Sequence, residues 1–199
     1  MPCKLLIATN NRGKLTEYRD LLASFDLVTL AEAGVADAVE ETGTTYAENA
    51  RLKATAAAAR SGLIALGDDS GLEVDALQGA PGMMSARYAG EHASDADKIS
   101  LLLKQLAGVP WQRRTARFRC VIALSTPSGD VAICEGKCEG FISLEPKGTG
   151  GHGYDPVFYM PELDMTMAQL PLDVKDRVSH RAHAAKQVPG LLARRPFNC

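Results

Sequence analysis

The chain has 199 residues, of which 46% are hydrophobic and 23% charged, values typical of a single globular domain that buries its core without disulfides or a structural metal. The formal net charge of −2 gives no general electrostatic reason to bind a long polyanion, which disfavours a nucleic-acid-binding module unless a local basic patch exists. No stretch approaches the roughly 20 apolar residues of a membrane span, and the start MPCKLLIATN lacks a small-residue cleavage pattern. We therefore expect a cytoplasmic protein without a signal peptide.

Strands and helices alternate along the chain, which predicts an α/β fold. The apolar run Lys4–Thr9 predicts a first strand, and apolar residues at helical spacing predict a helix over Lys14–Leu22. The clearest helix is expected over Thr45–Arg60, which has an alanine face and is followed by Gly62 as a stop signal. A buried strand over Leu63–Leu66 is expected to end at Gly67-Asp68-Asp69, where a glycine turn begins.

The second half continues the alternation. Ser94 is expected to cap a helix that runs to about Leu106. Two long strands, Thr115–Thr126 and Val131–Ile142, are expected to form a hairpin. A glycine-rich loop at Gly148–Gly153, a short strand at Pro156–Tyr159 and a last helix that starts at Ser179 and breaks at Pro189-Gly190 should follow. No repeat or linker is visible, so we expect one domain over residues 1–199.

The five cysteines are predicted to be free thiols, because their number is odd and their spacing irregular. Two of them, Cys134 and Cys138, could form half of a zinc site. Their neighbours read as a strand, however, and no second Cys/His pair lies nearby in the sequence, which favours two ordinary thiols. The complete set is Cys3, Cys120, Cys134, Cys138 and Cys199.

The first candidate ligand-binding segment follows the first expected strand. Ligands of open α/β sheets bind beyond the carboxyl ends of strands, and a helix N-terminus offers N–H groups suited to phosphate. The spacing is not that of a P-loop. On this segment alone, a polar turn with an N-cap is the stronger interpretation. The side chains that could contact a ligand are Thr9, Asn10, Asn11 and Lys14.

A second candidate lies around the start of the alanine-faced helix. Glu40 and Glu41 precede it and are candidate ligands for a hard cation. Thr45, Asn49 and Lys53 are spaced four apart, so they form a polar stripe that could face a ligand or solvent. A solvated face is the better interpretation of the stripe alone.

The sharpest local signal is Gly67-Asp68-Asp69-Ser70-Gly71. Neighbouring carboxylates repel one another, and a divalent cation relieves that cost. Mg²⁺ is usually held by one or two carboxylates together with substrate phosphates. A turn with solvated acids is the alternative, and the metal interpretation is favoured.

Two further segments carry possible nucleotide contacts. The glycines of the loop ending in Gly153-Tyr154-Asp155 would let backbone approach a ligand, and the rings of His152 and Tyr154 could stack on a base. A flexible connection is equally compatible with this loop. Lys175, His180 and Arg181 lie near the last expected helix, where Ser179 is a good N-cap and Arg181 offers a rigid fork of donors.

Taken together, these segments resemble the inosine triphosphate pyrophosphatase family, whose members act on non-standard purine nucleotides. The matching stretches occur in family order: TNNRGK with Glu17, EETGTTYAENARLKA, GDDSGLEVDALQGAPGMMSARYAG, GTGGHGYDPVFY and SHR. The resemblance implies an elongated mixed β-sheet flanked by helices, two lobes with a central cleft, and a homodimer. It also implies Mg²⁺-dependent hydrolysis of ITP, dITP and XTP to the monophosphate and pyrophosphate, which cleanses the nucleotide pool.

The resemblance also implies roles for residues of this chain. Asp69 is similar to the family's catalytic acid-base and metal residue, with Glu40 or Glu41 as the other metal carboxylate. The segment Thr9–Lys14, together with Lys53, is similar to the triphosphate-binding set. The remaining expected nucleotide contacts are Ser70, Gly153, Tyr154, Asp155, Lys175, His180 and Arg181.

This chain departs from the family pattern at His152, where Phe is usual and would stack on the purine. Histidine can also stack, so we expect altered affinity and pH dependence without loss of function. Donors on His180 and Arg181 would suit a 6-oxo purine and disfavour adenine. Two other classes are compatible with parts of the pattern: a nucleotide sensor without turnover, which would not need paired carboxylates, and a metal-dependent phosphomonoesterase, which would release orthophosphate.

Overall fold

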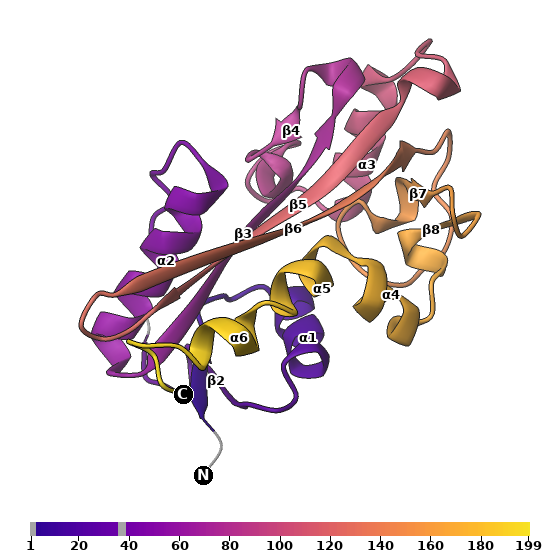
Figure 1. The fold of residues 1–199 in the computed structure, drawn as a ribbon. Coiled ribbons are helices and arrows are strands. Elements are labelled where there is room, and N and C mark those ends of the chain that lie inside the picture. The colour runs from indigo at the N-terminus through magenta and orange to yellow at the C-terminus, as the bar shows by residue number, and fades with distance from the viewer. Residues whose placement is uncertain (1–2, 36–38) are drawn as a thin grey trace. The chain divides into compact units, whose positions relative to one another are not determined.

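The computed structural model describes residues 3–35 and 39–199, and it confirms the predicted α/β fold (Figure 1). Within these residues one mixed sheet of eight strands is flanked by helices. The strands are β1 (Lys4–Ile7), β2 (Asp26–Thr29), β3 (Ile64–Val74), β4 (Pro81–Gly82), β5 (Thr115–Ser125), β6 (Val131–Ile142), β7 (Phe158–Met160) and β8 (Met165–Thr166). The helices are α1 (Arg12–Leu21), α2 (Tyr46–Ser61), α3 (Asp95–Gln105), α4 (Leu172–Val178), α5 (His180–Ala185) and α6 (Val188–Leu192). None of the described helices is both long and apolar enough to cross a lipid bilayer.

The strand order is β2-β1-β3-β5-β6-β7-β8, with β4 paired to β3. Strand β1 runs parallel to both β2 and β3, and it ends at Ile7, which pairs with Leu66, whereas β3 continues to Val74. Pairing is antiparallel between β3 and β4, between β6 and β7, and between β7 and β8. The parallel part therefore places the segment after β1 beside β3, as expected for a ligand-binding edge.

The chain divides into two compact units. Unit 1 contains Met1–Asp69, Cys120–Gly136 and Arg181–Cys199, and unit 2 contains Ser70–Arg119 and Lys137–His180. The long strands β3, β5 and β6 each contribute residues to both units. The single domain over residues 1–199 and the cleft implied by the family resemblance stay predictions.

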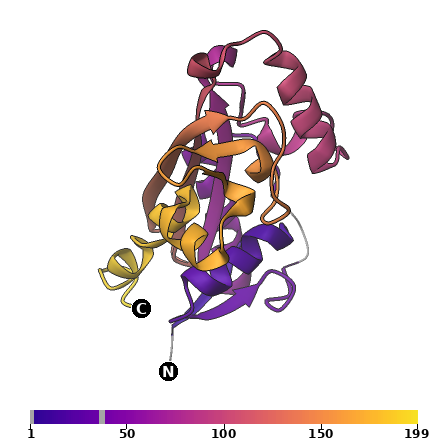
Figure 2. The same cartoon turned by 90° about the vertical axis from the view of Figure 1, so that its right-hand side faces the viewer.

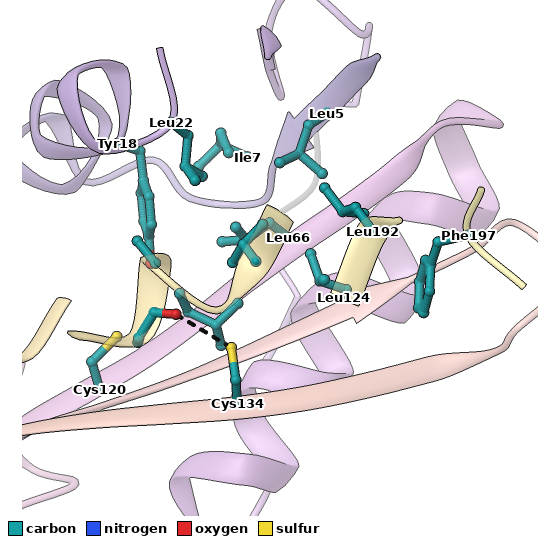
Figure 3. Close-up of a cluster of buried hydrophobic side chains, with 14 residues drawn as sticks. Leu5, Ile7, Tyr18, Leu22, Leu66, Cys120, Leu124, Cys134, Leu192 and Phe197 are labelled. Atoms are coloured by element: carbon teal, nitrogen blue, oxygen red, sulfur yellow. Dashed lines mark hydrogen bonds between the residues drawn. The ribbon is translucent and has the colours of Figure 1, made fainter. Parts of the chain in front are cut away.

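In unit 1 the alternation of β1 sorts its side chains between two apolar layers. Leu5 and Ile7 join a cluster that includes Tyr18 from α1 and Leu192 from α6 (Figure 3). Leu6 and Ala8 join a second cluster with α2, whose small alanines let this helix pack closely on the strands. Helices thus cover both sides of the sheet in unit 1, and the alanine face predicted from the sequence is buried.

The ends of α2 agree with the sequence prediction. Thr45 and Glu48 form a capping box at its N-terminus, and Gly62 closes it in the left-handed conformation. The prediction of a turn at Gly67 is wrong, because β3 continues to Val74. A Cβ at Gly67 would overlap the carbonyl oxygen of Ala50 and lie 2.7 Å from the amide nitrogen of Ala54. Gly67 is therefore needed for the close approach of α2 to the strand.

Unit 2 has its own apolar cluster. It is formed by the parts of β3, β5 and β6 that belong to this unit, by α3 and by the segment around β7. Ser94 caps α3 as predicted, again with a capping box. The buried guanidinium of Arg114 donates to the carbonyl oxygens of Leu106, Val109 and Ser143, which ties the end of α3 to the strands. This side chain satisfies backbone acceptors that the fold would otherwise leave buried without partners.

The C-terminal part differs from the prediction of one helix broken at Pro189-Gly190. Helix α4, which sequence reasoning missed, ends at Val178, and Ser179 is its C-cap as well as the residue before α5. Pro189 lies in the first turn of α6, where its missing N–H is tolerated, so it starts a helix instead of ending one. The short strand β2 also carried no clear sequence signal.

The prediction that all five cysteines are free thiols is wrong for two of them. Cys3 and Cys199 form a disulfide with a Cα–Cα distance of 5.4 Å. In both views the C-terminus lies near the start of β1 (Figures 1 and 2). A separation of 196 residues gives no spacing signal, which is why the pair could not be found from the sequence. Cys120, Cys134 and Cys138 are free and buried, as predicted.

Candidate active site

Asp69 lies in the middle of β3 and is largely buried, with 11% of its side chain exposed. Its Oδ1 accepts a hydrogen bond of 3.1 Å from the ammonium of Lys53, and its Oδ2 accepts one of 3.3 Å from the Nδ2 of Asn49. Both donors come from the polar stripe on α2 that the sequence identified. Burial raises the pKa of the Asp69 carboxyl, although the charges of Lys53 and Lys14 oppose this effect.

Asp68 is surrounded by different partners. Its Oδ1 pairs with the ammonium of Lys14, and its Oδ2 accepts from the Tyr18 hydroxyl at 2.6 Å and from the Arg181 Nε at 2.8 Å. The Cys120 thiol also donates to Oδ2, at 3.4 Å. Burial alone would raise the pKa of Asp68, but Arg181 and Lys14 hold it well below its usual range. Asp68 is thus a buried, ionised anchor for residues of α1 and α5.

The carboxylates of the two aspartates form ion pairs with different side chains. Adjacent side chains of a strand point to opposite faces, and each of these two has its own positively charged partners. The repulsion inferred from their adjacency is therefore relieved by lysine and arginine on either side.

The segment after β1 begins α1 as a polar turn with an N-cap, which was the stronger interpretation of this segment alone. Asn11 is the N-cap, and its Oδ1 accepts from the amide of Lys14 at 3.1 Å. Thr9 accepts from the amide of Asn11 at 3.2 Å. Asn10 and Asn11 are exposed, whereas the Lys14 ammonium reaches back to β3. This turn places Lys14 next to the Asp68–Asp69 segment within unit 1.

Glu41 and Asp69 share a contact, the ammonium of Lys53. The Lys53 ammonium is 2.7 Å from Glu41 Oε1 and 3.1 Å from Asp69 Oδ1, so both carboxylates converge on one positive charge. Burial lowers the pKa of Lys53, but Asp69 and Glu41 raise it above its usual value. Glu40 is exposed. The geometry therefore favours Glu41 over Glu40 as the second carboxylate of a cation site.

In unit 2 the glycine-rich loop is held by a buried ion pair. The Lys175 ammonium is 2.7 Å from Asp155 Oδ2, and this oxygen also accepts from the amide of His152 at 3.0 Å. Gly151 adopts φ 71°, and a Cβ there would overlap Asp155 Oδ2. The Tyr154 hydroxyl donates to the carbonyl oxygen of Ser85 at 2.9 Å, with its ring buried. The side chains of Asp155, Lys175 and Tyr154 therefore hold the loop in its conformation.

His180 and Arg181 belong to the same helix but to different units. The His180 ring stacks on Phe118 in unit 2, with centroids 4.7 Å apart. Arg181 is 1% exposed, and its Nη1 pairs with Glu17 while its Nε binds Asp68. The role of either residue as a nucleotide contact, like that of the partly buried Ser70, stays a prediction.

Sequence reasoning missed the part that Tyr18 and Glu17 play in this network. Tyr18 is one of the apolar positions that predict the helix over Lys14–Leu22, yet its hydroxyl binds Asp68. Glu17 appeared only as part of a family stretch, although it is buried and pairs with Arg181. A charged residue beside an aromatic one on the inner face of a helix was the available signal, because buried charges require partners.

Positive and negative side chains lie together in the described residues of unit 1. Lys14 and Lys53 bring positive charge to β3, and the carboxylates of Glu41 and Asp69 converge on the Lys53 ammonium. Such a set can bind a polyanion, hold a divalent cation and accept a proton from water. An α/β enzyme that acts on a phosphorylated small molecule fits this chemistry.

Comparison with known proteins agrees with this class. The model of the Ham1 family matches residues 5–189, so the chain belongs to the Ham1 family. A dITP/XTP pyrophosphatase of Halalkalibacterium halodurans is 49% identical over 185 residues, which cover 92% of this chain and 95% of that protein. A protein of the same name from Desulforamulus reducens is 51% identical over 193 residues, covering 96% of each. The structure of a HAM1 protein from Coxiella burnetii matches with a TM-score of 0.86 and 42% identity, covering 96% of this chain and 98% of that chain. The resemblance stated from the sequence is confirmed.

Proposed function

We propose that this protein hydrolyses ITP, dITP and XTP to the monophosphate and pyrophosphate, and thereby removes non-standard purine nucleotides from the nucleotide pool. The observation that carries this proposal is the convergence of Glu41 and Asp69 on one cation, with Lys14 nearby, in a member of the Ham1 family. The names of the similar proteins agree with this activity.

The reaction requires a water oxygen to attack the α-phosphorus while the bond to the oxygen that bridges the α- and β-phosphorus atoms breaks. The attacking water loses a proton, and we propose that the Asp69 carboxylate accepts it; the bonds from Lys53 and Asn49, which fix the orientation of this carboxylate, support the proposal. Negative charge develops on the departing pyrophosphate. Lys14 can stabilise that charge, and the N–H groups at the start of α1 can orient the phosphates.

Lys53 fits a different part of the site. Its ammonium donates to the backbone oxygen of Asp68 at 3.1 Å and pairs with Glu41 and Asp69, so its three hydrogens each have an acceptor. We infer that Lys53 holds the two carboxylates in place as well as lowering the charge of the bound triphosphate.

We also propose Mg²⁺ as the cofactor. Magnesium is usually bound by one or two carboxylates together with substrate phosphates, and not by a cage of protein ligands. Glu41 and Asp69 support this proposal, because their carboxylates already converge on one cation, the Lys53 ammonium. Bound there, Mg²⁺ would neutralise phosphate charge and align the triphosphate.

The proposed nucleotide contacts of unit 2 are the ring of His152 and the backbone of His152, Gly153 and Tyr154. A 6-oxo purine offers an acceptor where adenine offers a donor, so a loop and a His180 ring that present N–H groups would favour hypoxanthine and xanthine. His152 would stack on the base. Ser70, which follows Asp69 in β3, is a further proposed contact.

A panel of ITP, XTP, dITP, ATP and GTP, each with Mg²⁺ and with excess EDTA after removal of metal, tests the proposal. Chromatography of the products should show monophosphate and pyrophosphate from the first three nucleotides, and only with Mg²⁺. Release of orthophosphate would favour a phosphomonoesterase, and tight binding without products would favour a sensor. Full turnover in EDTA by metal-free protein would refute the metal requirement.

We propose in addition that the protein acts as a homodimer in the cytoplasm, as the family resemblance implies. Analytical ultracentrifugation at micromolar concentration should give about twice the chain mass of 21.2 kDa. A single species at the chain mass would contradict the dimer.

A further inference from the structure

The side chain of Asp95 in helix α3 contacts the glycine-rich loop. The amide of Gly153 donates a hydrogen bond of 2.6 Å to Oδ2 of Asp95, the first residue of α3 and 58 positions earlier in the chain. The other carboxylate oxygen, Oδ1, is 2.6 Å from the ammonium of Lys98. Lys98 is one turn further along α3 and fixes the orientation of the carboxylate. All three residues belong to unit 2.

Two further hydrogen bonds of the loop are made to residues that follow it. The Gly150 amide donates to the carbonyl oxygen of Ala168 at 3.0 Å, and the His152 amide donates to Asp155, which Lys175 holds. Asp95 therefore holds the loop from a separate helix. This arrangement fixes the backbone on two sides, as positioning of a ligand-binding loop requires.

Gly153 has no packing contact on the side where a Cβ would lie. It adopts φ 65°, and a Cβ placed on it would meet no heavy atom of the described residues within 4 Å. A glycine with open space on this side has a permissive backbone, so its bond to a charged acceptor contributes to holding its conformation. Hydrogen bonds to a carboxylate are also about twice as strong as those between neutral groups.

We propose that Asp95 is a positioning residue of the nucleotide-binding loop, which holds the Gly153 amide and thereby sets the His152–Tyr154 turn against the purine. This inference rests on the proposed function, because it assigns the loop to nucleotide binding. Asp95 itself does not touch the reacting atoms. Its effect is therefore expected on nucleotide affinity and not on the chemical step.

The alternative explanation is that Asp95 only stabilises the N-terminus of α3, where acidic residues are favourable. The chain contains a matched control for this explanation. Asp97 lies in the same first turn, and its carboxylate bonds to the amide and hydroxyl of Ser94 in the capping box. Removing Asp97 should weaken α3 at least as much as removing Asp95, but without a direct effect on Gly153.

The kinetic experiment compares Asp95→Ala, Asp95→Asn and Asp97→Ala in Mg²⁺-dependent hydrolysis of ITP. Asp95→Ala should raise KM about tenfold, in line with the loss of one charge-assisted hydrogen bond, with kcat within about twofold of wild type. Asp95→Asn keeps a carbonyl acceptor and should recover most of the affinity. Asp97→Ala should lower Tm and leave KM within about twofold. An equal rise of KM in Asp97→Ala, or an unchanged KM in Asp95→Ala, would overturn the inference.

A second measurement does not need activity. The NMR shift of the Gly153 amide in ligand-free protein should follow the titration of its acceptor carboxylate. Lys98, His152 and Tyr154 are titratable groups that interact with Asp95. Burial would raise the pKa of Asp95, but the bonds from Lys98 and Gly153 lower it. The midpoint should thus lie below the ordinary value of Asp, about 3.9.

The titration should disappear in Asp95→Asn and persist in Asp97→Ala. A Gly153 amide that does not titrate in the wild type would overturn the contact, even in a fully active enzyme. Conversely, a wild type that titrates as expected but does not hydrolyse ITP would confirm the contact while refuting the proposed function.

Discussion

Asp68 and Asp69 are neighbours in β3, yet their carboxylates lie on opposite sides of the strand and bind different helices. Asp68 binds Lys14 of α1 and Arg181 of α5, whereas Asp69 binds Asn49 and Lys53 of α2. Asp68 has no more than 1% of its side chain exposed, and Asp69 has 11%. The more buried carboxylate is the one with more compensating charge, which leaves the more accessible one for chemistry. The same substitution at the two positions should therefore have different consequences.

Asp69→Asn should abolish turnover without unfolding the protein. Asn has nearly the same shape, so packing should survive, but it accepts no proton and binds a cation weakly. Loss of general-base assistance alone typically lowers the rate by about 10²–10⁴-fold. Binding through Lys14 need not change, because that lysine pairs with Asp68. The assay is hydrolysis of ITP by protein whose fold has been checked by circular dichroism.

The control for this variant is Asp75→Asn. Asp75 follows the same strand, but its side chain is 45% exposed and pairs with Arg117. Hydrolysis by this variant should stay close to wild type. If Asp69→Asn hydrolyses ITP within tenfold of the wild type, the catalytic assignment is wrong and Asp69 is an ordinary polar residue.

Asp68→Asn should destabilise the protein. It removes the charge that compensates two buried cations, and breaking a buried ion pair from one side typically costs about 3–5 kcal/mol. Because the Asp68 pKa lies well below its usual range, its stabilising charge is present at neutral pH and is lost only as the pH falls through the lowered value. Urea unfolding at pH 7 should show a loss of several kcal/mol in Asp68→Asn and little loss in Asp69→Asn. Equal stabilities of the two variants would contradict the anchor role of Asp68.

The parts of the fold that could be predicted from the sequence are those with local signals. The alanine spacing of α2, the caps at Thr45 and Ser94, and the β5–β6 hairpin each depend on residues within a few positions of one another. Their physical causes act over short distances in the chain, so a pattern in the sequence is sufficient to find them.

The features that sequence reasoning missed depend on distant partners. Gly67 was interpreted as a turn residue because the approach of α2 to β3 is invisible in the sequence. The family stretches identified Asp69, Lys14 and Arg181, but not that Arg181 would be buried between Glu17 and Asp68. A charged side chain in a sequence does not say whether its partner will be a ligand or another residue of the protein.

Gly67→Ala should destabilise unit 1, because the added methyl group collides with the backbone of α2 and the helix must shift. Overpacking of this kind typically costs about 1–3 kcal/mol. Gly190→Ala is the matched control: Gly190 is exposed in α6, with no heavy atom of the described residues within 4 Å of a Cβ there. Alanine at that helical position should be neutral or stabilise by up to about 1 kcal/mol. Urea unfolding measures both changes, and a Gly67→Ala variant as stable as wild type would mean that α2 does not approach β3 so closely.

The cysteines should divide into two groups that react differently with a thiol reagent. In native protein purified without reductant, no cysteine should react at pH 8, because Cys3 and Cys199 are bonded to one another and the other three are buried. Burial raises the pKa of Cys134 to about 11 and that of Cys138 to about 12, and it raises the pKa of Cys120 well above its usual value, so few of these thiols are ionised. Reduction by dithiothreitol should make two residues reactive, and peptide mapping should identify them as Cys3 and Cys199. Cys3→Ser gives an independent control, because it should expose one reactive thiol, that of Cys199, without any reductant. Two reactive thiols in untreated wild type would show that the ends of the chain are not joined, whereas labelling of Cys120 in folded protein would show that the Asp68 network is open to solvent.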